Sequence, residues 1–432
     1  MENDSKVDLR EFEGSYLELF LASGIVFLLF VFAVLWQATN YFEYWETNDF
    51  AKPLFLFFVM STYGWLLLNA LGCAYTLLPI IHQTQFFRKK DLRVQMSFCM
   101  AGHVFITFAL LQRNIDYVTV AGLIGLILNA IGLASLSIPT FRVSRRKLKN
   151  FDQLGKVAYS LGIIMPIFGI IPIICWILVY GKTSLEVSMY IISTFMIGLV
   201  NLTFLVSHFE RRLGWDLIRD GNTIRVFKIY LLFTIIGITG TIFSTFFEAI
   251  PEYLVRLSQA LPFFWMFYAF NPSKVLSNIR KKYPVSKPIL VGYFILFFNG
   301  LVFLIPQQNV TDFSITFQPW IFLISSALLI NIGYGSYMND DHLHLSLQSR
   351  SNHRLFIYSV VASKTLLFYL LFTYNFETSI NFFLTIIWII SLVIVIFVTS
   401  QMLYKNLGVG SEGRKWSSTP MFYTKYQIKR EE

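Results

Sequence analysis

The sequence has few charged residues and few residues that bind metals. Only 14% of its 432 residues are charged and 55% are hydrophobic, a balance that excludes folding around a single soluble core. Cys73, Cys99 and Cys175 lie far apart within apolar segments, which predicts buried apolar side chains rather than a disulfide or a metal-binding set. Histidine is absent between Glu210 and Asp341, so nothing in that stretch supplies an imidazole ligand.

Common enzyme motifs are also missing. The sequence contains no Gly-rich phosphate loop followed by Lys-Ser/Thr, no His-Glu-x-x-His and no Gly-x-Ser-x-Gly, so it gives no support to a conventional NTPase or hydrolase. The run Asp340-Asp341-His342-Leu343-His344 lies in a predicted inner loop without neighbouring cysteines, and we do not interpret it as a metal site.

Apolar segments long enough to cross a membrane recur along the whole chain. A membrane-spanning helix needs about 20 apolar residues, and the windowed pattern contains about twelve such segments, separated by short polar connections. We therefore predict an all-α polytopic membrane protein that forms a single domain over residues 1–432. The predicted spans are Tyr16–Ala38, Pro53–His82, Val94–Gln112, Tyr117–Pro139, Ala158–Gly181, Glu186–His208, Val226–Ala249, Glu252–Phe270, Pro288–Ile305, Phe317–Met338, Arg354–Tyr374 and Ile380–Tyr404.

The net charge of +10 comes from basic clusters in alternate loops, which predicts orientation in the membrane rather than binding to nucleic acid. By the positive-inside rule, both termini are predicted to be cytoplasmic, with residues 1–15 and 405–432 as short tails of a cell-membrane protein. The polar, mixed-charge start does not predict a cleavable signal sequence. The clusters are Arg88, Lys89, Lys90 and Arg93; Arg142, Arg145, Arg146, Lys147 and Lys149; Arg211, Arg212, Arg219 and Arg225; and Lys274, Arg280, Lys281 and Lys282.

Glycine and proline suggest how the predicted helices pack. Gly122, Gly125 and Gly132 in one span, and Gly162 and Gly169 in the next, are placed for close approach between helices. Two prolines in the second of these spans, Pro166 and Pro172, are expected to bend it and to free backbone carbonyls that neighbouring groups or water then satisfy.

Two stretches resemble the haem-copper oxidase superfamily, most closely the cbb3-type and nitric oxide reductase-like catalytic subunits. The first stretch contains Lys52-Pro53-Leu54, Gly64-Trp65, Gly72, Tyr75 and Pro79. The second begins at Thr239-Gly240 and continues through Ala249-Ile250-Pro251-Glu252-Tyr253. The resemblance implies a subunit I-like bundle of twelve helices with both termini inside.

The resemblance also implies where metal ligands would stand, and this sequence lacks them. The haem-ligand histidine would fall within Leu54–Phe58, the paired copper ligands around Ile242–Ser244, and further haem ligands within Phe317–Met338. We therefore expect a non-catalytic or altered membrane subunit of a respiratory electron-transfer complex, without oxygen reduction of its own. Its expected partners are a cytochrome, Rieske or copper subunit, and quinone.

Two ionisable residues inside predicted spans support alternatives. Lys364 and His103 suggest a twelve-helix secondary transporter, because charge inside a bilayer is costly and is often functional. A second alternative is a membrane cytochrome that retains one haem on His103, with Met60 or Met100 as a further ligand. Met100 and His103 lie on the same predicted helix, so they cannot bind opposite faces of one haem.

Glu248, Glu252 and Arg256 surround the predicted turn between the seventh and eighth spans. Glu252 and Arg256 are spaced to pair on one helical face. A structural ion pair at the outer surface is the favoured interpretation, and docking of an extracytoplasmic redox partner is the alternative.

Overall fold

The computed structural model of the protein describes residues 10–39, 50–68, 71, 89–135, 137, 152–197, 223–246, 251–269, 273 and 286–304. Within these residues the regular elements are all helices and none is a strand, which agrees with the predicted all-α class. The elements are α1 (Arg10–Thr39), α2 (Ala51–Val59), the π-helix η3 (Met60–Leu66), α4 (Lys89–Leu110), α5 (Ile115–Ser135), α7 (Asp152–Leu178), α8 (Gly181–Ile197), α10 (Thr223–Phe246), α11 (Glu252–Ala269) and α13 (Ser286–Phe303).

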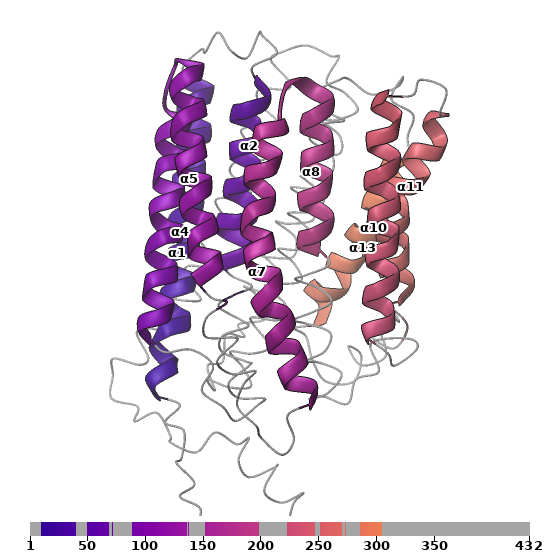
Figure 1. Ribbon diagram of the computed structural model, residues 1–432, viewed down its shortest axis with the longest axis horizontal. Helices are drawn as coiled ribbons and strands as arrows, with labels where there is room; N and C mark the ends of the chain where they lie inside the picture. The colour runs from indigo at the N-terminus through magenta and orange to yellow at the C-terminus, as the bar shows by residue number, and fades with distance from the viewer. Residues whose placement is uncertain are drawn as a thin grey trace, which may run out of the picture.

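The helices stand side by side in a bundle that follows the chain from one flank to the other (Figure 1). Helices α1, α4 and α5 form one flank, α2, α7 and α8 lie in the middle, and α10, α11 and α13 form the opposite flank. Short connections make sequence neighbours antiparallel: α5 begins a few residues after α4 ends, and α8 begins at Gly181, whose positive φ of 76° suits glycine.

Glycine sets the spacing between α4 and α5. A Cβ atom added at Gly102 would lie 2.7 Å from the Gly125 carbonyl oxygen, and one added at Gly125 would lie 2.7 Å from the Gly102 carbonyl oxygen. The two backbones are therefore in direct contact, as the predicted packing role of Gly125 requires. Gly132 faces Cys99 of α4 in the same way, and Gly169 of α7 faces the backbone of Ala130.

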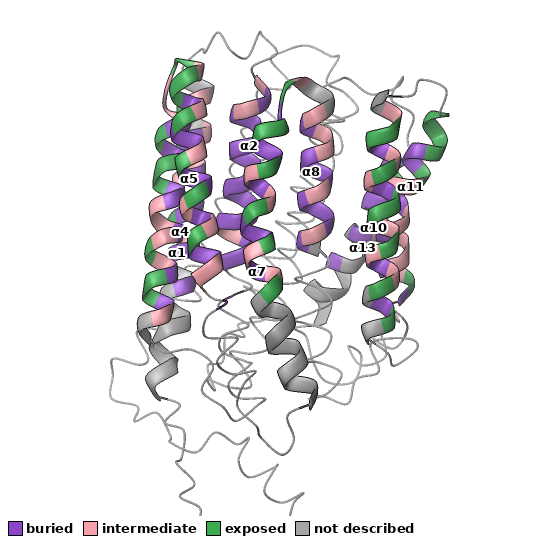
Figure 2. Cartoon of the chain, in the orientation of Figure 1, coloured by how far each residue is buried: buried purple, intermediate pink, exposed green. Residues whose placement is uncertain are grey.

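Large apolar side chains lie on the outside of the bundle. The green segments of α5 and α7 in Figure 2 mark exposed residues. On α5 and α7 the large apolar side chains recur every three or four residues along one helical face: Val120, Ile124, Ile127 and Ile131, then Ile163, Ile167, Ile170, Ile174 and Ile177. Two helical stretches, Asp91–Leu110 and Ile115–Ser135, are long and apolar enough to cross a membrane. Shorter apolar stretches occur at Ala22–Val34, Ile163–Leu178, Ser184–Met196 and Lys228–Ser244.

The interior combines apolar side chains with polar ones. Cys99 and Cys175 are free and buried, in agreement with the prediction that they serve as buried apolar side chains. Several hydroxyl and indole groups donate hydrogen bonds across helices to backbone carbonyls. Tyr230 Oη donates to the Thr194 carbonyl at 2.6 Å, and Trp265 Nε1 donates to the Val226 carbonyl at 3.1 Å.

Candidate functional site

His103 lies within α4, and its side chain is buried where α4 meets α1 and η3. A Cβ atom added at Gly64 of η3 would lie 2.9 Å from His103 Cε1 and 3.0 Å from Nε2, and it would also collide with Val26 of α1. His103 Nδ1 has no hydrogen-bond partner among the described residues. The ring is thus held by close packing, and its Nδ1 makes no hydrogen bond to a described residue.

The π-helix η3 faces His103. Its wider turn is closed by the Leu67 N–H, which donates to the Thr62 carbonyl, five residues earlier. Ser23 of α1 donates through Oγ to the Trp65 carbonyl at 3.3 Å, which ties η3 to α1. Short π-helical segments occur frequently at functional sites, and this one had no signal in the sequence pattern.

Tyr63 connects η3 to α7 at a carbonyl that proline leaves unpaired. Pro172 has no N–H, so it cannot donate the helical hydrogen bond to the Phe168 carbonyl, four residues before it. Tyr63 Oη donates to that carbonyl at 2.9 Å, and its ring lies 5.6 Å from the Phe168 ring. A neighbouring group therefore satisfies the carbonyl freed by Pro172, as the sequence predicted.

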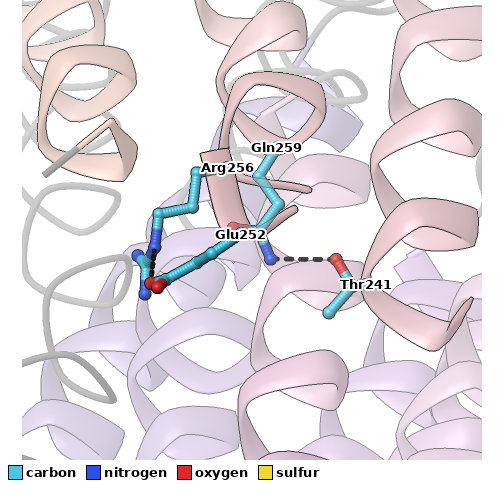
Figure 3. A network of polar contacts seen from close by, with 4 residues as sticks. All are labelled: Thr241, Glu252, Arg256 and Gln259. Atoms are coloured by element: carbon cyan, nitrogen blue, oxygen red, sulfur yellow. Dashed lines mark hydrogen bonds and ion pairs between the residues drawn. The ribbon is translucent and has the colours of Figure 1, made fainter. Parts of the chain in front are cut away.

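Glu252 and Arg256 form the predicted pair in the first turns of α11 (Figure 3). Arg256 Nε lies 2.8 Å from Glu252 Oε1. The Arg256 side chain is only 9% exposed, whereas that of Glu252 is 48% exposed. The carboxylate thus reaches in from the surface to a largely buried guanidinium, an arrangement that suits a structural ion pair.

A second polar contact on α11, between Gln259 and Thr241 of α10, was not predicted from the sequence (Figure 3). Gln259 Nε2 donates to Thr241 Oγ1 at 2.9 Å, and Thr241 Oγ1 donates to the Gly237 carbonyl at 2.7 Å. Tyr190 of α8 donates to the Gln259 carbonyl at 3.1 Å, so three helices share this network. These residues lie far apart in sequence, and their residue types alone do not predict that they are in contact.

The residues at the first position where the resemblance places a metal ligand cannot bind haem. Residues Leu54–Phe58 of α2 are buried, and their side chains pack within the bundle. The Phe57 ring lies 5.9 Å from that of Phe30, and the Phe55 ring lies 6.0 Å from that of Trp176. Aliphatic and phenyl side chains have no atom that can bind iron, and in this structure they pack against neighbouring side chains.

The position that corresponds to the copper ligands is equally unsuited. Ile242 and Phe243 of α10 are exposed, and Ser244 Oγ donates to the Thr241 carbonyl of its own helix at 2.8 Å. Among the described residues, no group of three or more His, Cys, Asp or Glu side chains could hold a metal ion. The sequence and the described side chains therefore agree that the residues at these positions do not fit a haem-copper centre.

Several sequence-based expectations fall outside the described residues. They include Lys364, Glu248, Cys73, the run Asp340–His344 and the spans Phe317–Met338, Arg354–Tyr374 and Ile380–Tyr404. Of the candidate site residues, the structure thus places His103, Glu252 and Arg256. It brings the last two together on α11, while His103 lies on α4, on the opposite flank of the bundle (Figure 1).

The sequence matches no protein-family model, and no curated protein and no solved structure matches it.

Proposed function

We propose that the chain is an integral protein of the cell membrane, with about twelve spanning helices in one domain and both termini in the cytoplasm. The exposed isoleucine and valine faces of α5 and α7 support this proposal, because in water such faces would be a large unfavourable apolar surface. The alternation in the sequence between basic loops and loops with almost no Lys or Arg supports the orientation.

Within the membrane, we propose that the chain serves as a subunit I-like scaffold in a respiratory electron-transfer complex. It would bind a cytochrome, Rieske or copper subunit, or quinone, without reducing oxygen itself. The observation that supports this proposal is the packing of Leu54–Phe58, because apolar side chains fill the position that the resemblance assigns to a haem ligand. The resemblance supplies the class of partner, and the packing supports the loss of the metal centre.

Affinity purification in mild detergent tests this function. The expected result is stoichiometric co-purification of an identified cytochrome, Rieske or copper subunit, or of quinone. A tagged membrane protein of unrelated function, extracted in the same way, provides the control for non-specific association. Recovery of the chain with none of these partners would contradict the proposal.

A secondary transporter is the second candidate. His103 is buried inside the bundle, its Nδ1 has no hydrogen-bond partner among the described residues, and the sequence places Lys364 inside a predicted span. Uptake of solute into proteoliposomes that is lost in Lys364→Met and in His103→Leu would favour this function. Lys228→Met is the matched control, since Lys228 is an exposed lysine of α10. If all three variants take up solute as fast as the wild-type protein, Lys364 and His103 give no support to a transporter.

A further inference from the structure

Helices α8, α10 and α13 bring buried polar side chains without hydrogen-bond partners among the described residues into one part of the bundle. Ser193 of α8, Thr234 of α10 and Asn299 of α13 are 0%, 1% and 1% exposed. Ser193 Oγ, Thr234 Oγ1 and both Nδ2 and Oδ1 of Asn299 lack a hydrogen-bond partner among the described residues. An unpaired polar group is unfavourable in a bundle interior, and four such atoms indicate that something else satisfies them.

Ser193 and Thr234 lie at the same level of the bundle. Tyr230 of α10 donates to the Thr194 carbonyl of α8, while Gly237, two turns later, lies against the Tyr190 ring. The two helices are therefore antiparallel over this stretch. Thr234 lies between Tyr230 and Gly237, just as Ser193 lies between Thr194 and Tyr190.

Asn299 belongs to the same layer through α11. Helix α11 is antiparallel to α10, because Trp265 donates to the Val226 carbonyl near the start of α10 whereas Gln259 donates to Thr241 near its end. Helix α11 therefore runs parallel to α8. In turn α13 is antiparallel to α11, since Gly300 lies against Phe263 and the Phe267 ring lies 5.6 Å from that of Phe294.

An aromatic group closes one side of this layer. The Phe303 ring stacks on Phe263, with centroids 5.4 Å apart, and meets the Tyr190 ring edge-on at 5.7 Å. Asn299 lies about one turn before Phe303, and Ser193 lies about one turn after Tyr190. Because α13 and α8 are antiparallel, both residues are on the same side of the aromatic contact.

We propose that Ser193, Thr234 and Asn299 form a site for bound water molecules inside the bundle. The three groups are uncharged hydroxyls and an amide, so they match a neutral ligand rather than an ion. The amide needs a donor for Oδ1 as well as an acceptor for Nδ2, and water provides both, whereas the carbonyl of an oxidised quinone can only accept. Buried waters typically make two to four hydrogen bonds to such otherwise unsatisfied groups.

Radiolytic hydroxyl labelling in ¹⁸O-water tests the site, because irradiation converts bound water into hydroxyl radicals, which oxidise an adjacent ring. The experiment uses the full chain in detergent and compares Phe303 with Phe30. Phe30 has the same 8% exposure and also packs against aromatic rings, but it lies on the opposite flank, away from the proposed site. We expect Phe303 to be labelled severalfold more than Phe30. Asn299→Leu should lower the labelling of Phe303 and leave that of Phe30 unchanged.

Thr234→Val provides a second variant of nearly unchanged shape in case Asn299→Leu does not fold, and it should lower Phe303 labelling in the same direction. Equal labelling of Phe303 and Phe30, or Phe303 labelling that neither variant changes, would overturn the water site. A quinone that co-purifies with the wild-type chain and is lost in Thr234→Val, without Phe303 labelling, would also overturn it. The site depends only on the helix bundle, so the result does not depend on any respiratory role.

Discussion

Tyr63 donates a hydrogen bond to the Phe168 carbonyl, the backbone group that Pro172 leaves without its helical partner. The contact joins η3 to α7 across 105 residues of sequence. Proline elsewhere produces a similar contact: Pro262 cannot donate to the Ser258 carbonyl, and Gly237 of α10 packs directly against that oxygen. The carbonyls freed by Pro172 and Pro262 therefore both lie at contacts between helices.

Tyr63→Phe should destabilise the protein by about 1 kcal/mol, because the Phe168 carbonyl loses its partner while the ring remains in place. The measurement is unfolding of the purified protein in mixed detergent, followed by circular dichroism. Pro172→Ala provides the matched background, since alanine at that position would restore the helical N–H donor. In that background Tyr63→Phe should have a smaller effect, and an equal loss of stability in both backgrounds would show that the carbonyl is not the reason.

Gly64→Ala should destabilise the protein by about 1–3 kcal/mol, the usual range for overpacking a filled interior. The added methyl group would collide with the His103 ring and with Val26. Gly24→Ala in α1 is the control, because a Cβ there meets nothing within 4 Å. Thermal unfolding of both variants checks the prediction, which fails if they unfold at the same temperature.

Glu252→Ala should destabilise the protein by about 1–3 kcal/mol, since it leaves the largely buried Arg256 guanidinium without its carboxylate. Asp116→Ala is the matched control: Asp116 is also acidic, exposed and in the first turn of a helix, but it forms no ion pair with a described residue. Both variants lose a favourable charge at a helix N-terminus, so the difference between them reports the pairing with Arg256. In the Arg256→Met background, Glu252→Ala should have little effect on the unfolding free energy, and an undiminished effect there would contradict the ion pair.

His103→Leu should change the unfolding free energy by less than about 1 kcal/mol, because it removes Nδ1, which has no hydrogen-bond partner among the described residues, and replaces the ring with an apolar side chain. Ile106→Ala on the same helix provides the contrast, since Ile106 is fully buried and its truncation should cost about 2–5 kcal/mol. Unfolding of both variants in detergent measures the difference. If His103→Leu were as destabilising as Ile106→Ala, the imidazole would have a structural role. A loss of function in that variant could then be explained by the loss of stability.

Local spacing accounts for what the sequence predicted of the candidate site. Glu252 and Arg256 are four residues apart on one helix, so their pairing needs no knowledge of the bundle. Gly125 and Gly132 likewise indicate close packing through their size alone. Pro172 predicts a free carbonyl, because its missing N–H is a property of the residue itself.

The remaining contacts depend on how distant helices align, which no local pattern specifies. Tyr63 could donate to many carbonyls, and only the register between η3 and α7 selects Phe168. The same holds for Tyr190 and the Gln259 carbonyl, and for the layer of Ser193, Thr234 and Asn299. Hydropathy also misses η3, because α- and π-helices have the same composition and differ only in hydrogen-bond register.

Helix ends were predicted less well than helix interiors. Apolar content begins at Tyr16, but α1 begins at Arg10, and α7 begins at Asp152 rather than at Ala158. Polar residues can continue a helix beyond the apolar segment, so hydropathy marks the apolar part of a helix and not its ends.

The reduced-minus-oxidised visible spectrum of the purified chain, with iron and copper measured per chain, tests the central claim most directly. The packing of Leu54–Phe58 and the exposed Ile242 and Phe243 predict no haem band and neither iron nor copper in stoichiometric amount. A haem band with one iron per chain would contradict the account, and it would place the redox function on His103.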